Sequence, residues 1–197
     1  MKKLNQPQLN TKTYWNYIYT TPARSREYWE RTYRFLNFLN YVKDGDKVID
    51  LGCGVGIPCR LVQEKKKDCE TWGVDISNEV IENNVSEEPK TTWKYGHIGN
   101  LSFLPMDYFD VAFCGEVIEH LDNPLVAFQD AYRVLKNNGK FIITTPIKNH
   151  IYSDEHQWEF EEQDIELLYK QVGFKNIKFE QLPNMEHTMI FFVIGEK

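Results

Sequence analysis

The sequence has 197 residues, 42% hydrophobic and 14% aromatic, which is enough to bury one full-sized core. A net charge of −6 and a pI near 5.4 argue against broad, non-specific capture of nucleic acid, because such binding needs a basic surface. No apolar run approaches the roughly 18 residues of a membrane span and the first residues lack a signal-peptide pattern, so we expect a cytoplasmic protein with no membrane span.

The four cysteines are Cys53, Cys59, Cys69 and Cys114, and none of them forms a C-x-x-C pair. They fall in or beside the apolar runs that should form the core. We therefore expect buried free thiols of a reducing compartment rather than disulfides or zinc ligands.

The N-terminal part of the chain is rich in aromatic residues. An aromatic cluster at residues 14–19 precedes Thr21 and Pro22, which are typical of a helix N-cap and first helical position. The helix is expected to run to about Tyr41. Apolar side chains at intervals of three and four residues predict its buried face: Trp29, Tyr33, Leu36 and Leu39.

Residues 48–56 read Val-Ile-Asp-Leu-Gly-Cys-Gly-Val-Gly, the pattern of a buried strand that turns sharply into a helix. Glycine permits a positive φ and, lacking Cβ, lets the backbone approach a ligand closely. Gly56 comes one residue too early for the dinucleotide fingerprint, and no Gly-Lys-Ser/Thr phosphate loop follows. The stretch predicts a nucleotide-cradling turn, with a ligand-free strand-to-helix turn as the alternative.

Asp75 ends the next apolar run, residues 71–75. Its distance from Gly52 is close to the roughly 20-residue interval at which a βαβ unit brings an acid to ribose hydroxyls. The alternative is that Asp75 only caps the next helix, a role that Ser77 can also fill.

The second half of the chain alternates apolar runs with helical patterns. A helix is expected to begin at Asn123-Pro124 and end at Asn138-Gly139, and a last helix to run from about 162 to 172. The short linker between the final two runs predicts that they pair antiparallel. Strands are expected at residues 92–95, 109–114, 141–144, 174–181 and 188–194.

Four stretches in order, residues 48–56, 73–75, 109–121 and 134–143, resemble the motifs of class I S-adenosylmethionine-dependent methyltransferases. The resemblance spans about residues 45–195 and is nearest to the ubiquinone-biosynthesis and sugar O-methyltransferase type. It implies an α/β fold, a Rossmann-like three-layer sandwich with a seven-stranded, mostly parallel sheet and a reversed last strand. It also implies one methyltransferase domain, residues 1–197, with a helical and aromatic lid segment at 1–44 and a cofactor-binding core at 45–197.

The implied cofactor is S-adenosyl-L-methionine, which leaves as S-adenosyl-L-homocysteine. His97 stands where the family usually has an acid that accepts from the adenine amino group. A neutral imidazole accepts such a bond and a protonated one does not, so cofactor binding is expected to weaken below about pH 6. In the alternative, His97 faces solvent and Ile98 alone contacts adenine. The matching cofactor positions are Asp50, Gly52, Cys53, Gly54, Gly56, Asp75, Ile76, His97, Ile98, Gly115 and Glu116.

The stretch Glu116-x-x-Glu119-His120 contains the candidate residues for activating the methyl acceptor, a role that the other motifs do not fill. On one helical turn these residues project to one side and could hold a metal ion, with His156 as a fourth ligand. This spacing resembles the metal-binding motif of small-RNA 3′-end 2′-O-methyltransferases. Similar sequences in ubiquinone-biosynthesis and sugar O-methyltransferases imply instead that His120 orients or deprotonates the acceptor. The acidic charge and small size favour this metal-independent reading, with Glu119, His120 and His156 as catalytic residues.

The expected partner is a small-molecule acceptor, most simply an oxygen on a metabolite or sugar, and nucleic acid is an unlikely substrate. A non-catalytic scaffold that keeps the cofactor fold is the second alternative. The candidate acceptor-binding residues come from the N-terminal segment and from the region after residue 144: Tyr14, Trp15, Arg24, Tyr152 and Trp158.

Overall fold

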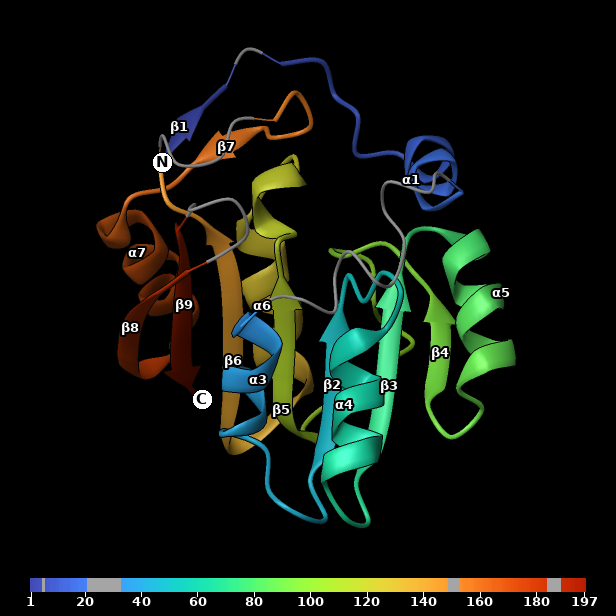
Figure 1. Ribbon diagram of the computed structural model, residues 1–197. Helices are drawn as coiled ribbons and strands as arrows, with labels where there is room; N and C mark the ends of the chain where they lie inside the picture. Colours follow the sequence, from blue (N-terminus) through green and yellow to red (C-terminus); the bar gives the residue numbers. More distant parts are fainter. Residues whose placement is uncertain (5, 21–32, 149–152, 184–188) are drawn as a thin grey trace.

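The computed structural model describes residues 1–4, 6–20, 33–148, 153–183 and 189–197 (Figure 1). Seven of the described strands form one sheet in the order β4-β3-β2-β5-β6-β9-β8. In that order the strands are β4 (Thr92–Tyr95), β3 (Glu70–Asp75), β2 (Lys47–Leu51), β5 (Phe109–Gly115), β6 (Leu135–Pro146), β9 (Met189–Glu196) and β8 (Lys175–Pro183).

The directions of the strands confirm the predicted sheet. Strands β4, β3, β2, β5 and β6 are parallel to their neighbours in that series, whereas β9 is antiparallel to both β6 and β8. The last strand of the chain is thus the reversed one, inserted between β6 and β8 rather than placed at the edge. A short connection between β8 and β9 leaves the chain no length for the crossover that a parallel pair requires.

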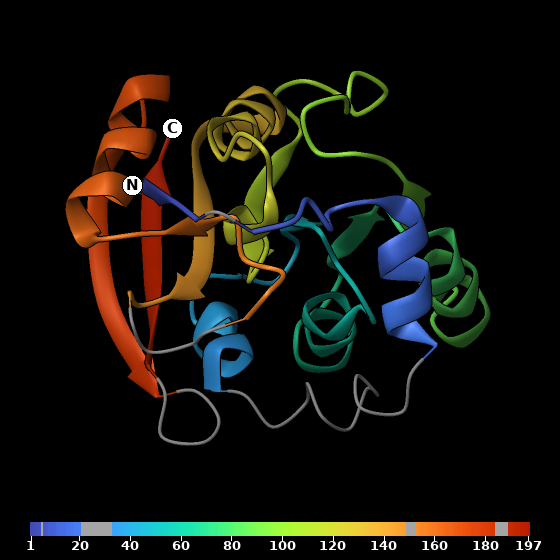
Figure 2. The ribbon, with the colours of Figure 1, turned by 90° about the horizontal axis from the view of Figure 1, so that it is seen from above.

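Helices cover both faces of the sheet and make three layers (Figures 1 and 2). One face carries α3 (Tyr33–Leu39), α4 (Ile57–Lys65) and α5 (Asn78–Glu87), and the other carries α6 (Leu125–Val134) and α7 (Glu162–Val172). Each face therefore has its own apolar cluster, because a parallel sheet is buried on both sides. In the part of the chain that the structure describes, no helix is long and apolar enough to cross a membrane.

The remaining elements lie at the carboxyl end of the parallel strands. Helix α1 (Lys12–Tyr19) and the small antiparallel pair of β1 (Lys2–Lys3) and β7 (Trp158–Glu159) cross this end (Figure 1). A 3-10 turn, η2 (Ile118–His120), follows β5 at the same end. Ligands of open α/β sheets bind at this end, so these elements surround the expected site.

The ends of helices α5 and α7 have the capping residues that the sequence pattern indicated. Ser77 is the N-cap of α5, and its hydroxyl accepts a hydrogen bond from the Val80 N–H. Helix α7 begins with a capping box formed by Glu161 and Asp164 and ends at Gly173, whose φ is 112°. The prediction of a last helix at about 162 to 172 is confirmed.

Two expectations about helices are wrong. Helix α6 ends at Val134, not at Asn138-Gly139, because Leu135 already pairs with Phe109 of β5 and begins β6. In α3, Leu39 is buried as expected, but Leu36 is exposed, and Phe35 and Phe38, which the predicted face did not include, are buried. Phe35 and Phe38 both pack on the ring of Phe113 in the sheet. The expected start of that helix, with Thr21, Pro22 and Trp29, lies outside the described residues.

Tyr169 joins α7 to the sheet and gives a test of the packing. Its buried hydroxyl donates to the carbonyl oxygens of Phe141 in β6 and Val193 in β9, both at 3.1 Å. Burial raises the pKa of this phenol well above its usual value, so it remains a donor across the ordinary pH range.

We predict that Tyr169→Phe lowers the free energy of unfolding in urea by about 1–2 kcal/mol, since two buried acceptors lose their donor. Tyr17→Phe is the matched control, because Tyr17 is 66% exposed. Equal effects of the two substitutions would contradict a bridging role for the Tyr169 hydroxyl.

Candidate active site

The site is built around the carboxylate of Asp75, at the end of β3. Its Oδ2 accepts from the Gly54 N–H at 2.9 Å, and its Oδ1 accepts from the Ser77 N–H at 2.8 Å. One carboxylate thus joins the glycine loop after β2 to the first turn of α5. Because Ser77 is the cap of α5, Asp75 has a different role from the simple helix cap that the sequence left open.

Burial decides the protonation of Asp75. The side chain is buried, and desolvation raises its pKa to about 6, although the N–H donors of Ser77, Gly54 and Ile76 oppose this shift. Above that pH the group is a buried anion that accepts hydrogen bonds. A ribose presents two hydroxyl donors, which is the complementary chemistry.

The glycines of the loop serve different purposes. Gly54 has a φ of 48°, and a Cβ built on it would lie 2.8 Å from the hydroxyl oxygen of Tyr19 in α1. Its carbonyl is fixed by the side-chain amide of Asn84 at 2.8 Å. At Gly56 a Cβ would lie 2.4 Å from the Trp93 ring, so packing explains this glycine. Gly54 is therefore the position at which bare backbone faces α1.

The other positions predicted to bind the cofactor also lie at the carboxyl end of the sheet. Asp50 in β2 and Cys53 in the loop are buried, as is Ile98 after β4. Buried Cys53, Cys59 and Cys114 have thiol pKa values well above the usual range because of desolvation, and all four cysteines, each within a described segment, are free. We expect these three thiols to be inert. The prediction of buried free thiols is confirmed for them, whereas Cys69 is free but only partly buried.

The turn after β4 separates His97 from Ile98. His97 is exposed, and its Nδ1 donates to the carbonyl of Ile98 at 2.7 Å, since a carbonyl only accepts. The Ile98 side chain is buried. A contact of His97 with adenine stays a prediction, and the arrangement supports the alternative in which Ile98 provides the apolar contact.

The Glu116-x-x-Glu119-His120 stretch does not form one helical turn, and this corrects the expectation. Glu116 has a φ of 55° and donates its N–H to the Thr144 carbonyl at 2.8 Å. It therefore continues the pairing of β5 with β6 instead of starting a helix. Only Ile118–His120 are helical, in η2. At Gly115 a Cβ would lie 2.6 Å from the ring of Phe113, two residues earlier in β5, and 3.2 Å from the Thr144 hydroxyl of β6, so packing explains this glycine.

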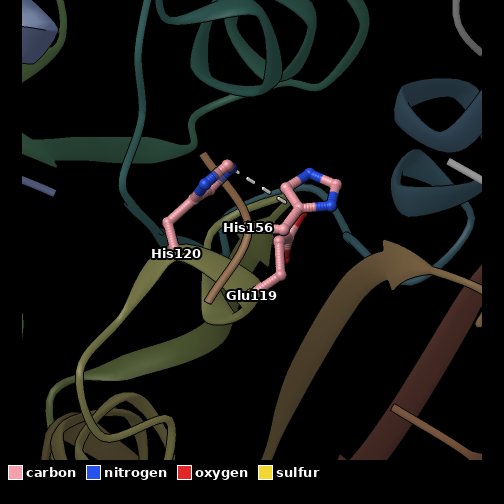
Figure 3. Close-up of side chains that lie close together, drawn as sticks. All are labelled: Glu119, His120 and His156. Carbon is pink, nitrogen blue, oxygen red and sulfur yellow. Dashed lines mark ion pairs between the residues drawn. The ribbon is translucent and has the colours of Figure 1, made fainter. Parts of the chain in front are cut away.

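Glu119 and His120 instead meet His156 from the segment before β7 (Figure 3). Within the described ranges, one ligand atom of each lies within 4.8 Å of the others, and all three residues are buried. The His120 and His156 rings are 5.1 Å apart, and His120 Nε2 lies 3.9 Å from Glu119 Oε1. The structure thus brings together the three residues predicted to be catalytic.

One hydrogen bond to the backbone fixes the tautomer of His120. Its Nδ1 lies 3.0 Å from the Glu155 carbonyl oxygen, and it must be the donor. In the neutral ring the lone pair is therefore on Nε2, the atom that faces Glu119. A proton taken up there would be stabilised by the carboxylate.

Thr145 is a site residue that the sequence analysis missed. Its hydroxyl donates to Glu119 Oε2 at 3.0 Å from the carboxyl end of β6. No signal in the sequence distinguishes Thr145 from Thr144, because the two threonines follow the apolar run 141–143 together. Thr145 holds the Glu119 carboxylate in place, while the Gln157 N–H donates to the Glu119 carbonyl at 2.7 Å.

Helix α1 contributes the aromatic residues predicted to bind the acceptor. The Trp15 ring packs edge-on against His120 at 5.1 Å, and the Tyr14 hydroxyl donates to Glu155 Oε1 at 2.5 Å. The next residue, Asn16, accepts from the Ser77 hydroxyl at 2.7 Å. Consecutive residues of α1 thus contact the turn after Asp75 and the histidine cluster, so these two halves of the site are close neighbours.

The other candidate acceptor residues are less informative. Trp158 in β7 donates its indole N–H to the Leu121 carbonyl at 2.8 Å. Its ring packs against the apolar cluster that includes residues of α6 and α7. Arg24 and Tyr152 lie outside the described residues. A role for these three in binding an acceptor stays a prediction.

Comparison with known proteins agrees with this geometry. A family model described as "Methyltransferase domain" matches residues 23–179. The chain is 28% identical over 170 residues to (+)-O-methylkolavelool synthase of Herpetosiphon aurantiacus, a match that covers 78% of this chain and 60% of the relative. It is also 28% identical over 109 residues to the ubiquinone biosynthesis O-methyltransferase of Actinobacillus pleuropneumoniae, covering 51% of this chain and 46% of the relative. The chain thus spans about half to three fifths of the length of these relatives.

Among solved structures, a SAM-dependent methyltransferase from Archaeoglobus fulgidus has a TM-score of 0.72 and 20% sequence identity, with 88% of this chain and 95% of that chain covered. That similarity establishes the fold, and the family match establishes membership. The chain therefore belongs to the methyltransferase-domain family and has the Rossmann-like fold of class I S-adenosylmethionine-dependent methyltransferases.

Proposed function

We propose that the protein transfers a methyl group from S-adenosylmethionine to a hydroxyl oxygen on a small metabolite or sugar. The observation that carries the proposal is the buried Asp75 carboxylate, fixed by the N–H groups of Gly54 and Ser77 beside the histidine cluster. The family match supports methyl transfer, and one relative is named as an O-methyltransferase.

The cofactor fits the residues at the carboxyl ends of β2, β3 and β4. Asp75 would accept from the ribose hydroxyls, the bare backbone at Gly54 would admit the ligand closely, and Ile98 would contact the adenine ring. When bound, S-adenosylmethionine supplies an electrophilic methyl group, which passes to the acceptor oxygen while the carbon–sulfur bond breaks. The chain's own contribution is chiefly to hold the acceptor in line with that bond.

His120 is suited to take the proton that the acceptor hydroxyl loses. Its Nε2 carries the lone pair in the neutral ring, and Glu119 lies 3.9 Å away to stabilise the protonated form. A positioned base of this kind typically contributes about 10²- to 10⁴-fold to rate. Trp15 and His156 flank the His120 ring and would line the acceptor.

In this proposal residues 1–44 are the helical and aromatic lid segment, of which α3 also packs on the sheet, and residues 45–197 are the cofactor-binding core. Four free thiols suit a reducing compartment, so we place the activity in the cytoplasm. The net charge of −6 supports a small-molecule acceptor over nucleic acid.

We predict that Asp75→Asn weakens the binding of S-adenosylhomocysteine at pH 7.5 by about 10- to 100-fold in calorimetric titration. The reason is the loss of the charged acceptor of two ribose hydrogen bonds. Asp68→Asn is the control, because Asp68 is exposed in the loop before β3, at the opposite end of the sheet. Unchanged affinity in Asp75→Asn would remove the ribose role.

Binding should also depend on pH. Because the free protein holds a proton on Asp75 below a pKa of about 6, the ligand must displace that proton, and the dissociation constant should rise by up to tenfold per pH unit below 6. Titrations of S-adenosylhomocysteine from pH 8 to 5 check this. His97→Asn should keep the slope and Asp75→Asn should abolish it; the reverse pattern would assign the effect to His97.

A second candidate, metal-dependent methylation of an RNA 3′ end, is favoured by one observation. Two imidazoles and one carboxylate, His120, His156 and Glu119, form a donor set that fits a divalent transition-metal ion. Glu116, which the sequence also predicted as a ligand for this function, is not part of the cluster found among the described residues. A bound ion would supply Lewis-acid chemistry to the acceptor hydroxyl, in place of His120 as base.

A metal titration separates the two candidates without knowledge of the acceptor. If the function is metal-independent, we predict that calorimetry detects no micromolar binding of Mn²⁺ or Zn²⁺ to wild type. The His156→Ala variant should then give the same titration curves as wild type. Micromolar binding that His156→Ala abolishes would instead favour the RNA-type function, and an acceptor screen should then begin with RNA 3′ ends in Mn²⁺.

A further inference from the structure

The side chain of Asn84, in α5, is buried beside the glycine loop and makes two hydrogen bonds. Only 2% of the residue is exposed. Its Nδ2 donates to the Gly54 carbonyl at 2.8 Å, and its Oδ1 accepts from Nη2 of Arg60, in α4, at 3.1 Å. A carbonyl only accepts and a guanidinium only donates, so the amide must be oriented in this way. Neither an aliphatic nor a carboxylate side chain could make both bonds.

Arg60 has a second contact with the same loop. Its Nε donates to the Val55 carbonyl at 3.2 Å, while Nη2 also donates to Glu87 Oε2 at 3.1 Å. The Arg60 side chain is only 10% exposed, whereas that of Glu87 is 52% exposed. Two consecutive carbonyls of the glycine loop are therefore held by side chains from α4 and α5, which lie on the same face of the sheet (Figure 1).

These bonds fix the peptide groups on both sides of Gly54. The Gly54 N–H donates to Asp75, and the Gly54 carbonyl accepts from Asn84. Gly54 has a φ of 48°, and glycine has more backbone freedom than any other residue, so a loop of this composition needs contacts to keep one conformation. The network supplies a constraint that the glycines themselves do not.

We propose that Asn84 and Arg60 are positioning residues of the cofactor site, which hold the glycine loop in the conformation that binds the S-adenosyl ligand. The inference rests on the function proposed above. Neither side chain has to touch the ligand: Asn84 acts through Gly54, and Arg60 acts through Val55 and Asn84. Without the network the loop would have to become ordered when the ligand binds, and that loss of entropy would weaken binding.

The first test is calorimetric titration of the full chain with S-adenosylhomocysteine at pH 7.5. We expect Asn84→Leu to raise the dissociation constant about 5- to 20-fold, because leucine has a similar size but neither donates nor accepts a hydrogen bond. Asn83→Leu is the matched control and should leave the constant unchanged, since Asn83 is the preceding residue of α5 and is exposed.

A second pair of variants separates the loop contacts of Arg60 from its ion pair. Arg60→Lys should raise the dissociation constant about two- to fivefold, because lysine keeps the charge but cannot reach the Val55 carbonyl and Asn84 together. Glu87→Gln removes only the exposed ion pair and should leave the constant unchanged.

The pH profile of binding is a readout that a purely structural role would not change. Burial raises the pKa of Asp75 to about 6, and the Gly54 N–H is one of the donors that oppose this shift. A loosened Gly54 would stabilise the anion less, so the pH below which binding weakens should move upward in Asn84→Leu and stay at the wild-type value in Asn83→Leu. Neither substitution alters the ionisable side chains on the elements around Asp75 and Gly54, which include Asp50, Cys53, Tyr19, Tyr95 and Lys12.

The outcomes distinguish the positioning role from the proposed function. If the variants lower the free energy of unfolding in urea but keep the wild-type dissociation constant and pH profile, the network is only structural and the proposed function stands. If Asn84→Leu does not fold, Arg60→Lys decides, and a wild-type affinity in that variant overturns the proposal. If wild type does not bind S-adenosylhomocysteine at all, the proposed function fails, and the positioning role fails with it.

Discussion

The arrangement of the site depends on one buried carboxylate. Asp75 accepts backbone N–H groups from the loop after β2 and from the start of α5, so two segments that follow different strands are held at one point. Burial of a charge without partners is costly, and these donors reduce that cost. The same contacts leave acceptor capacity for a ligand, because a carboxylate has about four lone-pair positions.

The histidine cluster depends on a different set of constraints. Hydrogen bonds from Thr145 and Gln157 and to the Glu155 carbonyl fix Glu119 and His120 between the end of β6 and the segment before β7. These residues come from separate parts of the chain and meet only because β5 and β6 end side by side. Chemistry on the acceptor would therefore be sensitive to the packing of that segment and of α1.

The sequence predicted the elements whose cause is local. The glycine loop, the cap at Ser77 and the end of α7 at Gly173 follow from residues that are adjacent in the chain. The predictions failed where a tertiary contact decided the outcome. Leu135 is not part of α6 because it pairs with β5, and Glu116 is not part of the helical turn because its N–H donates to β6. No local pattern marks Thr145, or the contacts of Trp15 and Asn16 with residues more than 60 positions away.

The central claim is that the carboxyl end of this sheet holds S-adenosylmethionine through Asp75. A crystal structure of the protein with S-adenosylhomocysteine tests it most directly. The account predicts both ribose hydroxyls within hydrogen-bond distance of the Asp75 carboxylate, with the sulfur directed toward His120. A nucleoside bound elsewhere, or a ribose that does not contact Asp75, would contradict it.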